Sequence, residues 1–187
     1  MKDCYSILSI FGATGDLTNR KLLHALYYLE QEKQLNEYFK IICIARKQKS
    51  NEQYRIDATE SIKKFSRIKV NDEILSKLVS RVYYNQLDFL NVEDYGKLKD
   101  FMEGIAGEKC SECERVFYLA VPSSLFSVII NNLKSVKLAE RNSNNKAYNR
   151  IVFEKPFGND IASAKELNNS IIKVFDEKQI YRIDHYM

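Results

Sequence analysis

The chain has 187 residues, of which 45% are hydrophobic and 29% are charged, and its formal net charge at pH 7 is +4. This composition is typical of a folded globular protein that is long enough to bury a sizeable core. The small, dispersed positive charge argues against a nucleic-acid partner. No apolar run approaches the roughly 18 residues of a membrane span and no signal peptide is visible, so we expect no membrane partner and a cytoplasmic location.

Strand-like and helix-like segments alternate along the chain. Apolar runs predict buried strands at residues 5–11, 40–45, 82–84, 115–120 and 150–153, and one more strand that starts with residues 179–182 and continues toward residue 187. Helices are predicted from residue 16 or 18 to about 33, and at 51–66, 71–81, 91–105, 123–138 and 161–175, with Asn71, Asn91 and Ser123 or Ser124 as N-caps. The alternation predicts an α/β fold of Rossmann type, with a doubly wound, mainly parallel sheet in a single domain spanning residues 1–187.

A glycine turn follows the first predicted strand. Gly12-Ala13-Thr14-Gly15 stands where the dinucleotide fingerprint GxGxxG belongs, although the first glycine of that pattern is absent. Glycines at this turn let the backbone approach a pyrophosphate, and the helix N-terminus that follows attracts phosphate. The turn therefore predicts a dinucleotide site, while glycines with a purely structural role remain the alternative.

Two basic residues, Arg46 and Lys47, follow the second predicted strand. In an NAD site an acidic residue at this place holds the ribose 2′-hydroxyl, and that acid would repel a 2′-phosphate. An arginine instead forms paired hydrogen bonds with phosphate. The charge at this strand end therefore favours NADP over NAD, unless the segment is only a solvated basic turn.

Polar residues also follow the fifth and sixth predicted strands. Glu154-Lys155-Pro156 lies at the sheet edge where open α/β sheets bind ligands, so we predict that Lys155 points into the crevice rather than being merely solvated. Asp184 and His185 are adjacent on the last strand, so they point to opposite faces and are not each other's partners. The single CxxC formed by Cys110 and Cys113 has no further ligands nearby, and we expect no metal site there.

Five segments in chain order resemble the glucose-6-phosphate dehydrogenase family. They are residues 12–18 with 20–22, 45–46, 117–122, 154–158 and 182–186. The resemblance extends over essentially the whole chain, and its last segment, Arg182-Ile-Asp-His-Tyr186, is the most specific. A Glu-Lys-Pro turn also occurs in other NAD(P)-dependent sugar oxidoreductases, so such an enzyme stays an alternative, as does a non-catalytic NADP-binding module.

The resemblance implies roles for the matched residues. Lys155 would bridge the substrate and the nicotinamide, and His185 and Tyr186 would bind the phosphate of glucose 6-phosphate. Asp184 would orient a catalytic histidine. The 2′-phosphate of NADP would lie against Thr14, Arg46 and Lys47. The remaining contacts with NADP would come from Gly12, Ala13, Gly15, Asp16, Leu17 and Pro122.

The family reaction removes a proton from the C1 hydroxyl of glucose 6-phosphate and passes a hydride from C1 to NADP, which gives 6-phosphogluconolactone at the entry to the pentose phosphate pathway. The family's base histidine and its C-terminal α+β domain, which completes the substrate pocket and forms the homodimer or tetramer, are not among the 187 residues. We therefore expect this chain alone to lack turnover. Leu125-Phe126 stands where the family often has an aromatic hydroxyl.

Overall fold

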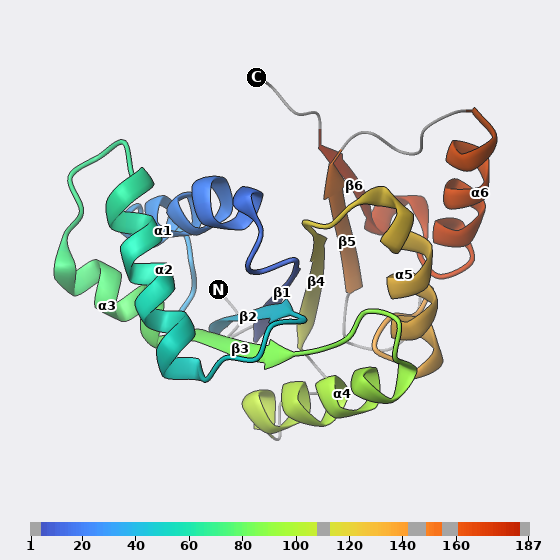
Figure 1. Cartoon of the computed structure of the whole chain (residues 1–187), viewed down its shortest axis with the longest axis horizontal. Coiled ribbons are helices and arrows are strands. Elements are labelled where there is room, and N and C mark those ends of the chain that lie inside the picture. Colours follow the sequence, from blue (N-terminus) through green and yellow to red (C-terminus); the bar gives the residue numbers. More distant parts are fainter. Residues whose placement is uncertain (1–4, 108–112, 142–148, 155–160, 184–187) are drawn as a thin grey trace.

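In the computed structural model, which describes residues 5–107, 113–141, 149–154 and 161–183, six strands form one sheet. They are β1 (Ser6–Phe11), β2 (Phe39–Ala45), β3 (Val82–Gln86), β4 (Glu114–Leu119), β5 (Asn149–Glu154) and β6 (Ile180–Ile183). All neighbours pair in parallel, in the order β3-β2-β1-β4-β5-β6 (Figure 1). The chain winds outward from β1 in one direction and from β4 in the other, so the predicted doubly wound α/β fold is confirmed.

Every crossover between the described strands contains a helix. A π-helical turn η1 (Thr18–Leu22) runs into α1 (Leu23–Gln31), and α2 (Asn51–Phe65) precedes α3 (Asp72–Ser80). The later elements are α4 (Val92–Ala106), the 3₁₀ turn η3 (Ser123–Leu125), α5 (Phe126–Ser135), α6 (Ile161–Ile172) and the 3₁₀ turn η4 (Glu177–Gln179). Figure 1 shows α1, α2 and α3 on one side of the sheet and α4, α5 and α6 on the other. No helix among the described residues is long and apolar enough to cross a membrane.

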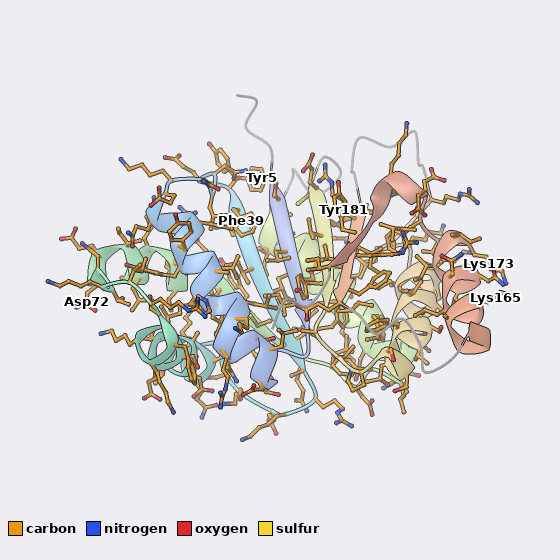
Figure 2. The ribbon with its side chains drawn as sticks, turned by 90° about the horizontal axis from the view of Figure 1, so that it is seen from above. Tyr5, Phe39, Asp72, Lys165, Lys173 and Tyr181 are labelled. Atoms are coloured by element: carbon orange, nitrogen blue, oxygen red, sulfur yellow. The ribbon has the colours of Figure 1, made fainter. Side chains whose placement is uncertain are left out.

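Alternate strand residues form two hydrophobic cores, one on each face of the sheet. Phe11, Phe117 and Phe153 belong to the core beneath α4, α5 and α6. Ile10 and Cys43 belong to the core beneath α1, α2 and α3. Because central parallel strands are buried on both faces, β1 and β2 appear in the sequence as nearly continuous apolar runs. Tyr5 and Phe39 lie at the amino ends of β1 and β2, and these ends mark the amino edge of the sheet (Figure 2).

Two of the predicted helix starts are confirmed. The Asn71 side chain accepts hydrogen bonds from the amides of Glu73 (2.9 Å) and Ile74 (3.2 Å), and Asn91 accepts one from the Glu93 amide at 3.1 Å. Each side chain satisfies amides that have no partner within the first helical turn. These asparagines therefore fix where α3 and α4 begin.

The predicted serine cap after β4 is wrong. The Leu125 amide donates to the Pro122 carbonyl at 2.9 Å, which closes a 3₁₀ turn over residues 123–125. Neither serine caps α5, which begins at Phe126 without a side-chain cap. The same helix ends at Ser135, before the predicted residue 138, since Lys137 adopts a left-handed backbone with φ of +60°.

Candidate dinucleotide-binding site

A crevice of about 580 Å³ opens at the carboxyl edge of the sheet, next to the ends of β1 and β4. The chain leaves these two strands in opposite directions, and open α/β sheets bind their ligands at such a point. The crevice has the size of a small-molecule site. Its lining comes from the segments that follow four strands: Gly12, Thr14, Gly15, Ala45, Arg46, Lys47, Phe89, Ala120, Val121, Pro122 and Leu125.

Gly12 lies where the segments after β1 and β4 approach each other closely. Its φ is +94°, and a Cβ added there would stand 2.2 Å from the Ala120 carbonyl oxygen. A side chain is therefore excluded by both backbone conformation and space. The resulting close approach keeps the backbone of the turn at the floor of the crevice.

Backbone hydrogen bonds fix the turn against β2 and the following helix. The amides of Gly12 and Ala13 both donate to the Ile44 carbonyl, at 2.9 and 3.0 Å, and the Gly15 amide donates to the Gly12 carbonyl at 2.9 Å. The buried Thr18 hydroxyl donates to the same Gly12 carbonyl at 3.1 Å. The turn is therefore a preorganised part of the fold.

The helix after the turn starts differently from the prediction. One continuous α-helix was expected, but Thr18–Leu22 forms a π-helical turn in which the Leu23 amide donates to the Thr18 carbonyl. Such wide turns occur frequently at functional sites. The Asn19 side-chain amide reaches back to the Thr14 carbonyl at 3.4 Å. The wide turn therefore lies directly beside the glycine turn.

Two stacked tyrosines, which no sequence motif predicts, support the loops after β1 and β2 beside the crevice. The rings of Tyr54 and Tyr84 lie 4.9 Å apart. The Tyr54 hydroxyl donates to the Ala13 carbonyl, and the Tyr84 hydroxyl donates to the Lys47 carbonyl. Burial raises the pKa of both phenols above the ordinary tyrosine value, so both hydroxyls keep the protons that they donate. No local motif marks these tyrosines, because their partners are 41 and 37 residues away in the sequence.

Arg46 and Lys47 occupy the end of β2, as predicted, and both side chains are exposed. Their backbone is fixed, since the Arg46 carbonyl accepts a hydrogen bond from the Gln86 side chain at 3.3 Å and the Lys47 carbonyl accepts one from Tyr84. Both residues line the crevice together with Thr14. The structure thus brings three of the predicted cofactor residues, from two separate loops, to the same crevice.

The other predicted cofactor residues take different positions. Pro122 lines the crevice and Asp16 is exposed beside it, where its carboxylate pairs with Arg20 at 2.6 Å. The side chains of Ala13 and Leu17 pack into the core beneath α1 and do not line the crevice. These two residues can therefore reach a cofactor only through their backbone.

The position of the family's aromatic hydroxyl is filled by Leu125, which lines the crevice. Phe126, the other residue considered for this place, is only 2% exposed. Its ring packs against Phe153 at a centroid distance of 5.4 Å in the core. Phe126 is therefore a core residue and does not substitute for the aromatic contact.

A side-chain hydrogen bond joins the carboxyl ends of β4 and β5. Glu154 accepts a hydrogen bond of 2.7 Å from the Tyr118 hydroxyl. The predicted site residues Lys155, Pro156, Asp184, His185 and Tyr186 lie outside the described residues, as does Cys110. Cys113 is buried, and the described residues contain no group of three or more His, Cys, Asp or Glu that could hold a metal ion.

Comparison with known proteins places this geometry in a family. The sequence model described as "Glucose-6-phosphate dehydrogenase, NAD binding domain" matches residues 9–187. The glucose-6-phosphate 1-dehydrogenase of Chlamydia pneumoniae is 40% identical over 182 residues, which are 97% of this chain and 36% of that protein. The protein of the same name from Rhizobium meliloti is 41% identical over 179 residues, which are 95% of this chain and 34% of that protein.

Solved structures agree with the sequence comparison. A glucose-6-phosphate dehydrogenase in complex with its substrate glucose-6-phosphate has a TM-score of 0.84 and 35% identity to this chain, and the match covers 98% of this chain and 37% of that one. The glucose-6-phosphate 1-dehydrogenase from Mycobacterium avium has a TM-score of 0.81 and 33% identity, with 96% and 36% covered. This chain thus spans about a third of the length of its relatives. It belongs to the glucose-6-phosphate dehydrogenase family, of which it is the NAD-binding domain.

Proposed function

We propose that this chain binds NADP in preference to NAD, and that it is the cofactor-binding part of an enzyme that oxidises glucose 6-phosphate. Family membership implies a nicotinamide dinucleotide. The finer preference rests on one observation: Arg46 and Lys47 stand at the carboxyl end of β2, on the crevice wall, where an NAD site carries an acid. A guanidinium there attracts a 2′-phosphate that an acid would repel.

The described residues fit such a cofactor. The space beside Gly12 that a Cβ would fill lets a pyrophosphate approach the backbone of the turn. Phe89, Val121 and Leu125 give one part of the crevice an apolar surface that suits a flat base. Thr14, Arg46 and Lys47 also line the crevice and supply a hydroxyl and two cations.

We further propose the family reaction for the whole protein, in which the C1 hydroxyl loses its proton and the bound nicotinamide accepts the hydride from C1. The support is the substrate named with one similar structure, glucose-6-phosphate. Lys155, Asp184, His185 and Tyr186 are the proposed substrate and catalytic residues on this chain. Self-association as a dimer or tetramer is proposed for the whole protein.

The 187-residue chain alone should form no detectable NADPH from glucose 6-phosphate, since it spans 36% of such a relative.

The cofactor preference is tested by measuring dissociation constants for NADPH and NADH with this chain, using the fluorescence of the reduced cofactors. Replacing Arg46→Ala should weaken NADPH binding by about 1.5–3 kcal/mol, the value of a lost charge-assisted contact, and should leave NADH binding nearly unchanged. The matched control is Lys173→Ala, which removes one exposed positive charge from the turn just after α6 (Figure 2), at a residue that does not line the crevice. Equal weakening of both cofactors in Arg46→Ala would refute the 2′-phosphate assignment.

A further inference from the structure

A second, polar pocket of about 460 Å³ adjoins the dinucleotide crevice. Thr14 and Lys47 line both spaces, so the two open into the same region of the surface. The second pocket lies between the turn after β1, the loop after β2 and helix α2. It therefore begins where the crevice carries its predicted 2′-phosphate residues.

Four of the charged residues that line this pocket form two ion pairs. Lys49 Nζ pairs with Asp57 Oδ2, and Arg20 Nε pairs with Asp16 Oδ1 at 2.6 Å. The Lys49 side chain is 18% exposed, whereas that of Asp57 is 43% exposed. Lys49 is therefore a largely buried cation that is held by a partly solvated carboxylate, only two residues beyond Lys47.

The backbone on both sides of Lys49 is fixed. The Lys47 carbonyl accepts the Tyr84 hydroxyl, and Ser50 caps α2 through reciprocal hydrogen bonds with Gln53, at 2.9 and 3.1 Å. A change of partner at Lys49 thus involves its flexible four-carbon side chain and not the loop. Lys49 itself lines the second pocket.

We propose that Lys49 is a specificity-determining residue for NADP, and that Asp57 restrains it by competing for its ammonium. On binding, the ribose 2′-phosphate replaces the Asp57 carboxylate as the partner of Lys49. A phosphate carries more negative charge than a carboxylate and offers three acceptor oxygens. A half-exposed ion pair contributes little, so the exchange favours the phosphate. This inference rests on the proposed preference for NADP.

Two substitutions at this pair should act in opposite directions on NADPH binding. Lys49→Gln removes the ammonium and should weaken NADPH about ten-fold or more, the effect of a lost charge-assisted hydrogen bond. Asp57→Asn removes the competing charge and should tighten NADPH binding about two- to five-fold, the worth of a partly exposed pair. NADH lacks the 2′-phosphate, so its dissociation constant should change less than about two-fold in both variants.

The decisive experiment measures NADPH and NADH affinities for the parent chain, both single variants, Lys49→Arg and the double variant. Lys49→Arg keeps the charge and should keep most of the NADPH affinity. In the Lys49→Gln background, Asp57→Asn should have no effect, because Asp57 acts only through Lys49. Far-UV circular dichroism and the melting midpoint establish that each variant is folded, and Lys49→Arg remains informative if Lys49→Gln is not.

The inference is overturned if Lys49→Gln weakens NADPH and NADH equally, if both single variants change NADPH affinity in the same direction, or if Lys49→Arg loses as much affinity as Lys49→Gln. Failure of the proposed function looks different: the parent chain itself would bind NADPH no better than NADH. If the parent chain prefers NADPH and Lys49→Gln binds NADPH with unchanged affinity, the proposed function stands and only the role of Lys49 is rejected.

Discussion

The Tyr54 hydroxyl on α2 donates a 2.9 Å hydrogen bond to the Ala13 carbonyl in the glycine turn. Tyr54 is 2% exposed, and the bond joins residues that are 41 positions apart. Because Ala13 also donates its amide to Ile44, the peptide units of the turn are fixed from two directions. The glycine turn is thus hydrogen-bonded to α2, the helix that also carries Asp57.

Replacing Tyr54→Phe should lower both stability and cofactor affinity. It leaves the Ala13 carbonyl without its buried donor, which costs about 1–3 kcal/mol. The loss should appear in the free energy of unfolding measured by urea denaturation, and the loosened turn should raise the dissociation constant for NADPH. The matched control is Tyr27→Phe, which removes another buried hydroxyl, bonded to the Asn71 amide at 2.8 Å away from the crevice. It should lower stability alone, and an equal loss of affinity in both variants would contradict the role of Tyr54.

Replacing Gly12→Ala should abolish dinucleotide binding. The new Cβ would meet the Ala120 carbonyl oxygen at 2.2 Å in a residue with φ of +94°, so β1 and β4 would have to separate locally. The control is Gly104→Ala in α4, where a Cβ meets no atom within 4 Å. That change should stabilise the chain by up to about 1 kcal/mol, because alanine favours helix. Unimpaired NADPH binding by Gly12→Ala would show that the close approach is not required.

Much of the fold follows from local patterns in the sequence. β1 and β2 lie within about a residue of their predicted bounds, because buried parallel strands leave uninterrupted apolar runs. Asn71 and Asn91 identify helix starts by a local mechanism, the satisfaction of free amides. Gly12 and Arg46 were found as site candidates because a strand, a turn and a helix must follow one another in a dinucleotide fold.

Features that depend on contacts distant in the sequence were not predicted. In the sequence, nothing distinguishes Tyr54 from the other apolar residues of α2, because the partner of its hydroxyl, Ala13, lies 41 residues away. Ser123 resembles an N-cap in the sequence. In the structure the Leu125 amide donates its hydrogen bond to the Pro122 carbonyl instead of to a serine side chain. Lys49 precedes α2 and Asp57 lies within it, and the two side chains meet across the first turns of the helix, a contact that no local motif marks. The second pocket is therefore a property of packing rather than of a motif.

A buried ion pair between α1 and the residue that follows α3 should be the most sensitive charged site for stability. Glu30 and Arg81 have side chains that are 3% and 8% exposed, and Glu30 Oε2 lies 3.0 Å from Arg81 Nη1. Glu30→Ala leaves a buried guanidinium without its counter-charge and should lower the free energy of unfolding by about 3–5 kcal/mol. Lys63→Ala, which breaks an exposed pair with Asp72, should cost less than about 1 kcal/mol. Similar urea midpoints for the two variants would disprove this difference.

Alkaline pH should destabilise the chain through Cys43 before most tyrosines ionise. Burial raises the pKa of the Cys43 thiol to about 12, whereas an unfolded cysteine titrates near about 8.5. Above the unfolded pKa the unfolded state binds fewer protons than the folded state, so the free energy of unfolding falls as pH rises. The stabilisation is complete below about pH 8.5 and is lost progressively toward pH 12.

Urea denaturation at a series of pH values from 7 to 11 tests this directly. Cys43→Ala should be less stable than the parent at pH 7, because it empties part of the core beneath α2, but its stability should decline less steeply above pH 8.5. The buried Tyr54 has a raised pKa for the same reason and should steepen the decline in both proteins above about pH 10. The thiol of Cys43 should also resist alkylation in the folded chain at pH 8, since the thiolate is the reactive form. Parallel curves for the parent and Cys43→Ala, together with rapid alkylation of Cys43, would show that this thiol titrates normally.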